Sequence, residues 1–148
     1  ATGAYPRKIP EHVTNDVSNI FSIRNINDVQ LLKKKFANSR KALIVGGGYI
    51  GLEAAAVCRE KGLHVLLVES GDRILQRVAC KETSIFLKMM HKEKGVDIRE
   101  AVHAKSIHED GKQIIKANLE HLKKNGRFIL IRPNVETVTS KEIESYVN

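Results

Sequence analysis

A cluster of glycines near the middle of the chain has the residue types and spacing of a phosphate-binding turn. The chain reads Gly46-Gly-Gly-Tyr-Ile-Gly51, which satisfies the pattern GxGxxG through Gly46, Gly48 and Gly51. In such a turn the first glycine permits the tight bend, the second lets the backbone approach a pyrophosphate, and the third lets helix and strand pack closely. A helix that begins here presents unpaired N–H groups and about half a positive charge to a diphosphate. We therefore expect the phosphates of a dinucleotide to bind at Gly46, Gly47, Gly48, Tyr49, Ile50 and Gly51.

A carboxylate eighteen residues beyond the last of these glycines completes the pattern. Glu69 ends the next apolar run, where an acid accepts hydrogen bonds from the adenosine ribose hydroxyls and repels the additional phosphate of NADP. We therefore predict NAD(H) rather than NADP(H), with Ser70 beside Glu69 in the site. A P-loop is excluded, because Leu52 and Glu53 stand where Lys and Ser or Thr are required. Glu53 falls in the second turn of the expected helix, and its position alone allows it to face solvent or to work near the ligand.

The segments around the glycines have the pattern of a βαβ unit, which makes the short motif specific. Residues Lys41–Gly46 form the continuous aliphatic run expected of a buried strand in a parallel sheet. Residues Tyr49–Lys61 have apolar side chains at helical spacing, with Gly62 as the C-terminal cap, and His64–Glu69 supplies a second buried strand. The connection between the two strands is expected to be right-handed.

The flanking segments extend this pattern to an α/β fold: a Rossmann-like βαβ parallel sheet with an antiparallel β-hairpin or meander crossover. Ahead of the unit, a helix is predicted from Asp28 to Phe36, with three consecutive lysines on a solvated face. Beyond it we expect a helix at Lys81–Lys92 whose two methionines fill the core, a strand at Val96–Arg99, and a hairpin with its tip at Glu109–Lys112. Further on, the pattern allows a helix at Leu119–Lys124 and a strand at Phe128–Ile131.

The composition is that of one globular domain. The chain has 148 residues, 42% of them hydrophobic and 28% charged, and domains contain roughly 100–200 residues. The longest uncharged runs are far short of the roughly 18–20 residues of a membrane span, and the first residues lack the features of a signal peptide. We therefore expect no membrane association and a cytoplasmic location, and the absence of an initiator Met indicates a piece of a longer protein.

The cysteines, the histidines and the net charge limit which metal sites and binding partners the chain can have. The two cysteines lie 22 residues apart without a CxxC pair, and no histidines have metal-ligand spacing, so we expect neither a metal site nor a catalytic residue. The net charge of +8 raises the question of a nucleic-acid or acidic partner, which composition alone does not answer. Nucleic acid is disfavoured, because aromatic residues make up only 5% and Trp is absent, which leaves little for base stacking.

With these residues in view, the chain resembles the pyridine-nucleotide domain of FAD-dependent oxidoreductases. The resemblance is closest to the oxygenase-coupled, NADH-dependent ferredoxin reductases of the putidaredoxin and rhodocoxin reductase type, and extends to about residue 117. Several motifs recur in order: Ala1-Thr-Gly-Ala-Tyr-Pro-Arg7, Ile23-Arg-Asn-Ile-Asn-Asp28, the glycine segment from Ile44 to Ala55, Val68-Glu69, Arg73-Ile-Leu-Gln-Arg-Val78 and His91 to Arg99.

The resemblance implies cofactors and residue roles. It assigns residues 1–36 to the end of an FAD domain and its connector, and 37–148 to an NAD(H)-binding domain. Arg24 would contact FAD, Glu53 would lie beside the nicotinamide and Arg77 near the NAD phosphates. The implied reaction is hydride transfer from NADH to FAD, followed by electron delivery to a ferredoxin-type iron–sulfur protein.

Departures from the family pattern limit what this chain is expected to do alone. A complete FAD site is missing, so we expect no turnover by the isolated chain, and uncovered apolar surface makes self-association plausible. Residues 118–148 are atypical, since only Ile131-Arg-Pro-Asn134 matches the expected turn. The alternative is a non-catalytic nucleotide-binding remnant or a basic interaction module.

Overall fold

The computed structural model describes residues 20–36, 39–102, 106–110, 113–118 and 128–132, with side chains described in the first two ranges. In chain order, the elements are β1 (Ile20–Phe21), α2 (Ile26–Phe36), β2 (Lys41–Val45), α3 (Tyr49–Glu60), β3 (His64–Val68), α4 (Lys81–Glu93), β4 (Val96–Arg99), β5 (Ser106–Asp110), β6 (Gln113–Asn118) and β7 (Phe128–Arg132). The predicted helix at 119–124 and residues 111–112 of the predicted hairpin tip lie outside the described residues, whereas Glu109 and Asp110 belong to β5.

Five of these strands form one sheet, in the order β1-β7-β2-β3-β4. Strands β2, β3 and β4 are parallel, with Lys41 opposite His64 and Val65 opposite Val96. Strand β7 is antiparallel to both β1 and β2. The predicted Rossmann-like parallel sheet is therefore confirmed for β2–α3–β3–α4–β4, with an antiparallel strand added beside β2.

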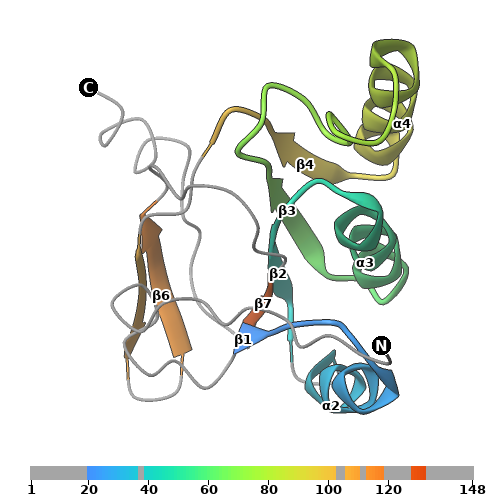
Figure 1. Ribbon diagram of the computed structural model, residues 1–148. Helices are drawn as coiled ribbons and strands as arrows, with labels where there is room; N and C mark the ends of the chain where they lie inside the picture. The colour runs from blue at the N-terminus through green and yellow to red at the C-terminus, as the bar shows by residue number, and fades with distance from the viewer. Residues whose placement is uncertain (1–19, 37–38, 103–105, 111–112, 119–127, 133–148) are drawn as a thin grey trace, which may run out of the picture.

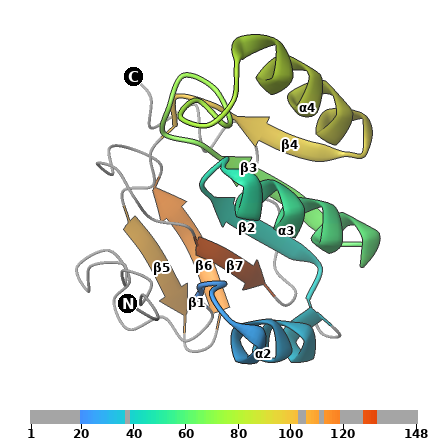
Figure 2. The same cartoon turned by 45° about the vertical axis from the view of Figure 1, so that its right-hand side comes forward.

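The molecule has three layers. Figure 1 shows α2, α3 and α4 on one face of the sheet and the antiparallel pair β5–β6 on the other, and the turned view agrees (Figure 2). The predicted hairpin is present, shifted toward the C-terminus, with Ser106 opposite Asn118 and a register shift between His108 and Glu109. This arrangement leaves the carboxyl ends of β2, β3 and β4 together at one edge of the sheet.

The core lies between the sheet and α3. Strand β2 buries Ala42 and Ile44 on its helix side, while its other residues are half-buried. Helix α3 meets them with small side chains, Ala54 and Ala55, which allow the helix to approach the sheet closely. Full burial of a side chain as large as Ile44 contributes about 1.5–3 kcal/mol, so this layer fixes the position of the glycine turn.

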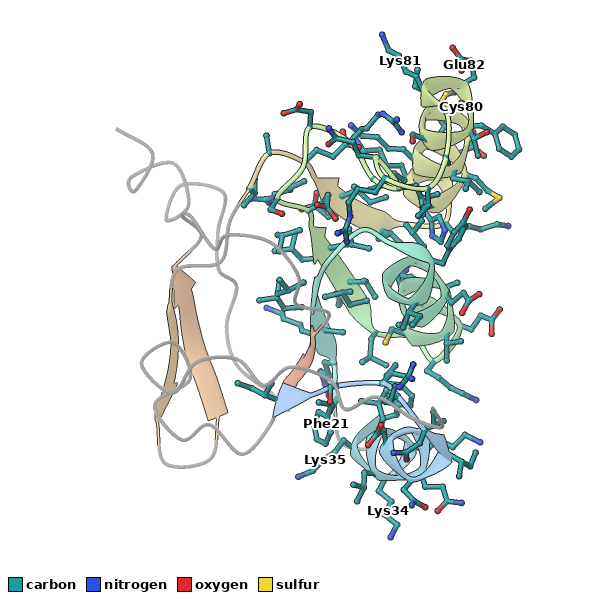
Figure 3. The ribbon with its side chains drawn as sticks, in the orientation of Figure 1. Phe21, Lys34, Lys35, Cys80, Lys81 and Glu82 are labelled. Atoms are coloured by element: carbon teal, nitrogen blue, oxygen red, sulfur yellow. The ribbon has the colours of Figure 1, made fainter. Side chains whose placement is uncertain are left out.

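Helix α2 joins the same core through a single buried side chain. Leu32 packs into it, and Leu31, which the sequence places on the apolar face, is exposed. The lysines at positions 33–35 are exposed as predicted, and Figure 3 shows Lys34 and Lys35 extending away from the helix.

Helix α4 differs from its prediction. Met89 and Met90 are exposed, so the expectation that they fill the core is wrong. The buried residues of this helix are Ser84 and His91, with Leu87 packed at the edge of the core. A polar Ser84 is accommodated there because its hydroxyl donates to the carbonyl oxygen of Ile74 at 2.7 Å, a partner that hydrophobic periodicity does not reveal.

Candidate functional site

The glycine turn joins β2 to α3 by a close backbone contact. Gly46 has φ of 113°, a conformation that favours glycine, and its N–H donates to the carbonyl oxygen of Val68 at 2.8 Å. A Cβ added to Gly51 would lie 1.9 Å from the carbonyl oxygen of Gly46. The start of the helix therefore touches the end of the strand, and no side chain fits between them.

The first turn of α3 offers backbone donors without a competing side chain. Gly48 is the N-cap residue, has no side-chain cap and accepts from the N–H of Leu52 at 3.0 Å. No acidic residue lies in this first turn. Because the opening N–H groups of a helix have no intrahelical partner, those of Tyr49, Ile50 and Gly51 are suited to an anion. Tyr49 itself is exposed, and Ile50 is half-buried.

Glu69, directly after β3, turns its carboxylate toward the glycine turn. Its Oε2 accepts from the N–H of Gly47 at 2.6 Å, and its Oε1 accepts from the N–H of Gly71 at 2.7 Å. The hydroxyl of Ser70 donates to the same Oε1 at 3.3 Å. The structure thus brings Glu69 and Ser70 together with the glycines.

Gly47 has a role that the GxGxxG pattern does not assign to its second position. A Cβ on Gly47 would lie 2.7 Å from Cγ2 of Ile74 and 3.1 Å from the Cβ of Glu69. A side chain there would push the segment after β3 away from the turn. The glycine is needed so that Glu69 can reach the backbone N–H.

The segment from Ser70 to Ala79 is fastened to the site at two points. The N–H of Leu75 donates to the carbonyl oxygen of Gly47 at 2.9 Å, and the N–H of Ile74 donates to Oε1 of Glu100 at 2.9 Å. Glu100 also pairs with the ammonium of Lys88 on α4. Sequence reasoning missed Glu100 and Lys88, since neither belongs to a motif and only the fold brings them together.

Arg73 supports this segment from the side of α4. Its guanidinium donates to the hydroxyl of Ser84 and to the carbonyl oxygens of Gln76 and Cys80. The residue therefore joins the segment to the start of α4.

Three further predicted site residues, Arg77, Glu53 and Arg24, lie on other parts of the structure. Arg77 belongs to the same segment and is exposed, and Glu53 is exposed on α3. Arg24 precedes α2, where its backbone N–H donates to the Asp28 carboxylate at 2.7 Å. The roles that the resemblance implies for these three residues stay predictions.

The two cysteines are free, Cys58 buried and Cys80 exposed. Burial raises the pKa of Cys58 to about 11, which keeps its thiol protonated at neutral pH. In the part of the chain that the structure describes, no group of three His, Cys, Asp or Glu side chains is arranged to hold a metal. None of the described helices is long and apolar enough to cross a membrane.

Comparison of the sequence with protein families gives one match over nearly the whole chain. The family model described as pyridine nucleotide-disulphide oxidoreductase matches residues 1–142. Putidaredoxin reductase of Pseudomonas putida is 35% identical over 101 residues, which are 67% of this chain and 24% of that protein. A ferredoxin reductase subunit of 5,5'-dehydrodivanillate O-demethylase from Sphingobium is 43% identical over 91 residues, 62% of this chain and 22% of that protein.

Solved structures show the same likeness. The ferredoxin reductase for the CYP199A2 system from Rhodopseudomonas palustris has a TM-score of 0.77 at 26% identity, over 98% of this chain and 35% of that one. The reductase in a covalent putidaredoxin reductase–putidaredoxin complex has a TM-score of 0.67 at 27% identity, over 89% of this chain and 31% of that one. The chain spans about a quarter of the length of the curated relatives it matches.

Proposed function

The chain belongs to the pyridine nucleotide-disulphide oxidoreductase family, and from this premise we propose that it binds NAD(H) and serves as the hydride-donor side of electron transfer from NADH to FAD. Ferredoxin reductases are among its relatives. In this proposal residues 37–148 form the NAD(H)-binding domain, and residues 1–36 come from an FAD domain and its connector.

One observation carries the proposal: the Glu69 carboxylate is held at 2.6 Å from the N–H of Gly47, beside a helix start that has no side-chain cap. The helix start favours the negative diphosphate, since its N–H groups and dipole both attract an anion. The Glu69 carboxylate contacts Gly47, the residue before the N-cap Gly48. There it can accept hydrogen bonds from ribose hydroxyls and disfavour a 2′-phosphate. The residues present therefore fit NADH better than NADPH.

The remaining predicted residues complete the proposal. Glu53 lies beside the nicotinamide, Arg77 neutralises the NAD phosphates, and Arg24 contacts FAD. Bound FAD supplies the hydride-accepting chemistry, and the electrons pass from it to an iron–sulfur protein. The residues of this chain form no complete FAD site in this proposal, so we expect NADH binding by the 148-residue chain without turnover.

Calorimetric titration with NADH and NADPH tests the nucleotide site. We expect saturable NADH binding, with NADPH weaker by about tenfold or more, and a loss of about tenfold in NADH affinity in Glu69→Gln, because hydrogen bonds to a charged acceptor contribute about 1.5–3 kcal/mol. Glu60→Gln is the matched control, since Glu60 is exposed at the opposite end of α3. Equal binding of both nucleotides, or equal effects of the two substitutions, would contradict the proposed site.

A salt series separates this function from a basic interaction module. Binding of DNA or an acidic protein that falls steeply with salt, without NADH affinity, would support the module instead. The net charge of +8 alone is compatible with either, because acidic iron–sulfur proteins also fit a basic surface.

A further inference from the structure

The segment that follows Glu69 holds a second side-chain acceptor close to the proposed nucleotide site. The side chain of Gln76 reaches back toward the start of this segment, and its Oε1 accepts from the N–H of Asp72 at 2.9 Å. A Cβ added to Gly71 would lie 2.6 Å from the same oxygen. The amide group of Gln76 therefore lies against the backbone of Gly71 and Asp72.

Glu69 and Gln76 divide two consecutive backbone donors between them. The N–H of Gly71 donates to Oε1 of Glu69 at 2.7 Å, and the next N–H, that of Asp72, donates to Gln76. A Cβ on Gly71 would also lie 3.2 Å from Oε1 of Glu69, so the two acceptors flank the same residue. Both N–H groups are thus satisfied by side chains of the chain itself.

The backbone that carries these donors is held in place by the residues after β4. The carbonyl oxygen of Gly71 accepts from the N–H of Ala101, and that of Glu69 accepts from the N–H of Val102, both at 2.9 Å. The segment is therefore fixed independently of its side chains. Loss of the Gln76 amide would leave the backbone where it is and change only what its N–H groups meet.

The first cation after β3 is engaged on the side of α4. Arg73 donates to the hydroxyl of Ser84 and to the carbonyl oxygens of Cys80 and Gln76, and Ser84 is buried on α4. An arginine near the ribose is the usual partner of the 2′-phosphate of NADP. Arg73 has its donors committed to protein acceptors instead.

We propose that Gln76 is a second determinant of the preference for NAD(H) over NADP(H), an inference that rests on the nucleotide-binding function proposed above. Because Glu69 accepts from the ribose hydroxyls in that function, a phosphate on the 2′-oxygen would lie beside its carboxylate, against the segment that begins at Ser70. Successive backbone N–H groups can bind such a phosphate. Gln76 occupies the N–H of Asp72 and covers the backbone there, which removes a donor from NADP(H) and takes nothing from NAD(H).

Calorimetric titration of Gln76→Ala with NADH and NADPH tests this inference. The substitution frees the N–H of Asp72 and uncovers the backbone beside it. We therefore expect the ratio of NADPH affinity to NADH affinity to rise by about threefold or more. A residue that only supported the fold would lower both affinities by the same factor and leave this ratio unchanged.

Two further variants serve as controls. Gln76→Glu keeps an oxygen that accepts from the N–H of Asp72, and its charge repels a phosphate, so the ratio should stay at or below that of the unchanged chain. Gln30→Ala removes an exposed glutamine from α2 and should leave the ratio unchanged. Gln76 is itself exposed, and circular dichroism of each variant checks that the fold is retained.

Failure of this inference can be told apart from failure of the proposed function. If the unchanged chain does not bind NADH, or binds both nucleotides equally, the proposed function falls and the role of Gln76 falls with it. If the unchanged chain prefers NADH and Glu69→Gln weakens NADH binding, the function stands. An unchanged ratio in Gln76→Ala, or an equal rise in Gln76→Glu or Gln30→Ala, would then overturn the role of Gln76 alone.

Discussion

Gly51 and Gly62 are both required to be glycine, and the structure gives them different reasons. A Cβ on Gly51 would meet the Gly46 carbonyl oxygen, whereas a Cβ on Gly62 would meet nothing within 4 Å, and the cost there comes from its φ of 81°. We expect Gly62→Ala to lower the free energy of unfolding by about 1 kcal/mol and Gly51→Ala by about 3 kcal/mol. Urea unfolding measures both. Equal losses would show that helix and strand do not approach as closely as described.

The proposed nucleotide site illustrates how much of a site the residue types and their spacing can predict. The sequence indicates Glu69 from its distance to the glycines, and the structure turns that carboxylate to the Gly47 N–H. The sequence does not indicate Glu100, because a carboxylate that binds the backbone of a neighbouring segment does not occur at a fixed spacing from that segment. Such partners are defined only when β4 is placed beside β3.

At the scale of elements, Glu100 links three parts of the domain: the end of β4, the segment after β3, and α4. Its carboxylate accepts from the N–H of Ile74 and pairs with Lys88. Glu100→Gln keeps an acceptor for that N–H and loses the ion pair, whereas Glu100→Ala loses both. We expect exchange protection of the Ile74 and Leu75 amides to fall in the order unchanged chain, Gln, Ala, by about tenfold overall. Hydrogen exchange with mass spectrometry reads this order.

NADH affinity should follow the same order, since this segment holds Leu75 against the glycine turn. Glu93→Gln is the control, because Glu93 is exposed on α4, the helix that carries Lys88. Protection that does not change in Glu100→Ala would remove Glu100 from the positioning of the site.

Arg59 holds the ends of two helices together. Its Nε donates to the carbonyl oxygen of Lys94 at 3.0 Å and its NH1 group to that of Leu63 at 2.7 Å, which places a positive charge where the α3 and α4 dipoles are negative. We expect Arg59→Met to lower the free energy of unfolding by about 2 kcal/mol. Thermal or urea unfolding tests it against Lys61→Met, an exposed cation two residues further on, at the C-cap of α3. Similar small losses in both would contradict the bridging role.

Element boundaries were predictable where local chemistry sets them. The strands at 41–45 and 64–68 and the helices between and after them begin and end within about a residue of their predictions. Gly46, Gly62 and Gly95 follow β2, α3 and α4, and the polar residues Glu69 and Ser70 follow β3. The direction of β7 was not predictable, since an apolar run such as Phe128–Arg132 has the same pattern whether it lies parallel or antiparallel. The inward side of α4 was also misassigned, because its buried face is polar.

At the scale of the whole molecule, the pH dependence of stability follows from a buried histidine. Burial lowers the pKa of His91 below its ordinary value of 6.5. Below pH 6.5 the unfolded chain therefore binds a proton at this position that the folded chain does not. The free energy of unfolding then decreases as the pH is lowered, until the pH passes below the pKa of His91 in the folded chain. Above pH 6.5 this residue adds no dependence.

We expect the contribution of His91 to the free energy of unfolding to be constant above about pH 6.5 and to fall as the pH is lowered below it, with a slope of at most about 1.4 kcal/mol per pH unit. His91→Gln should lose that part of the slope at any absolute stability, because glutamine does not titrate. His64→Gln should keep it, since His64 is exposed on β3. Urea unfolding at a series of pH values gives all three slopes. The same slope in His91→Gln as in the unchanged chain would mean that another group resists protonation in the fold, and that His91 reaches water more freely than its place on the buried face of α4 allows.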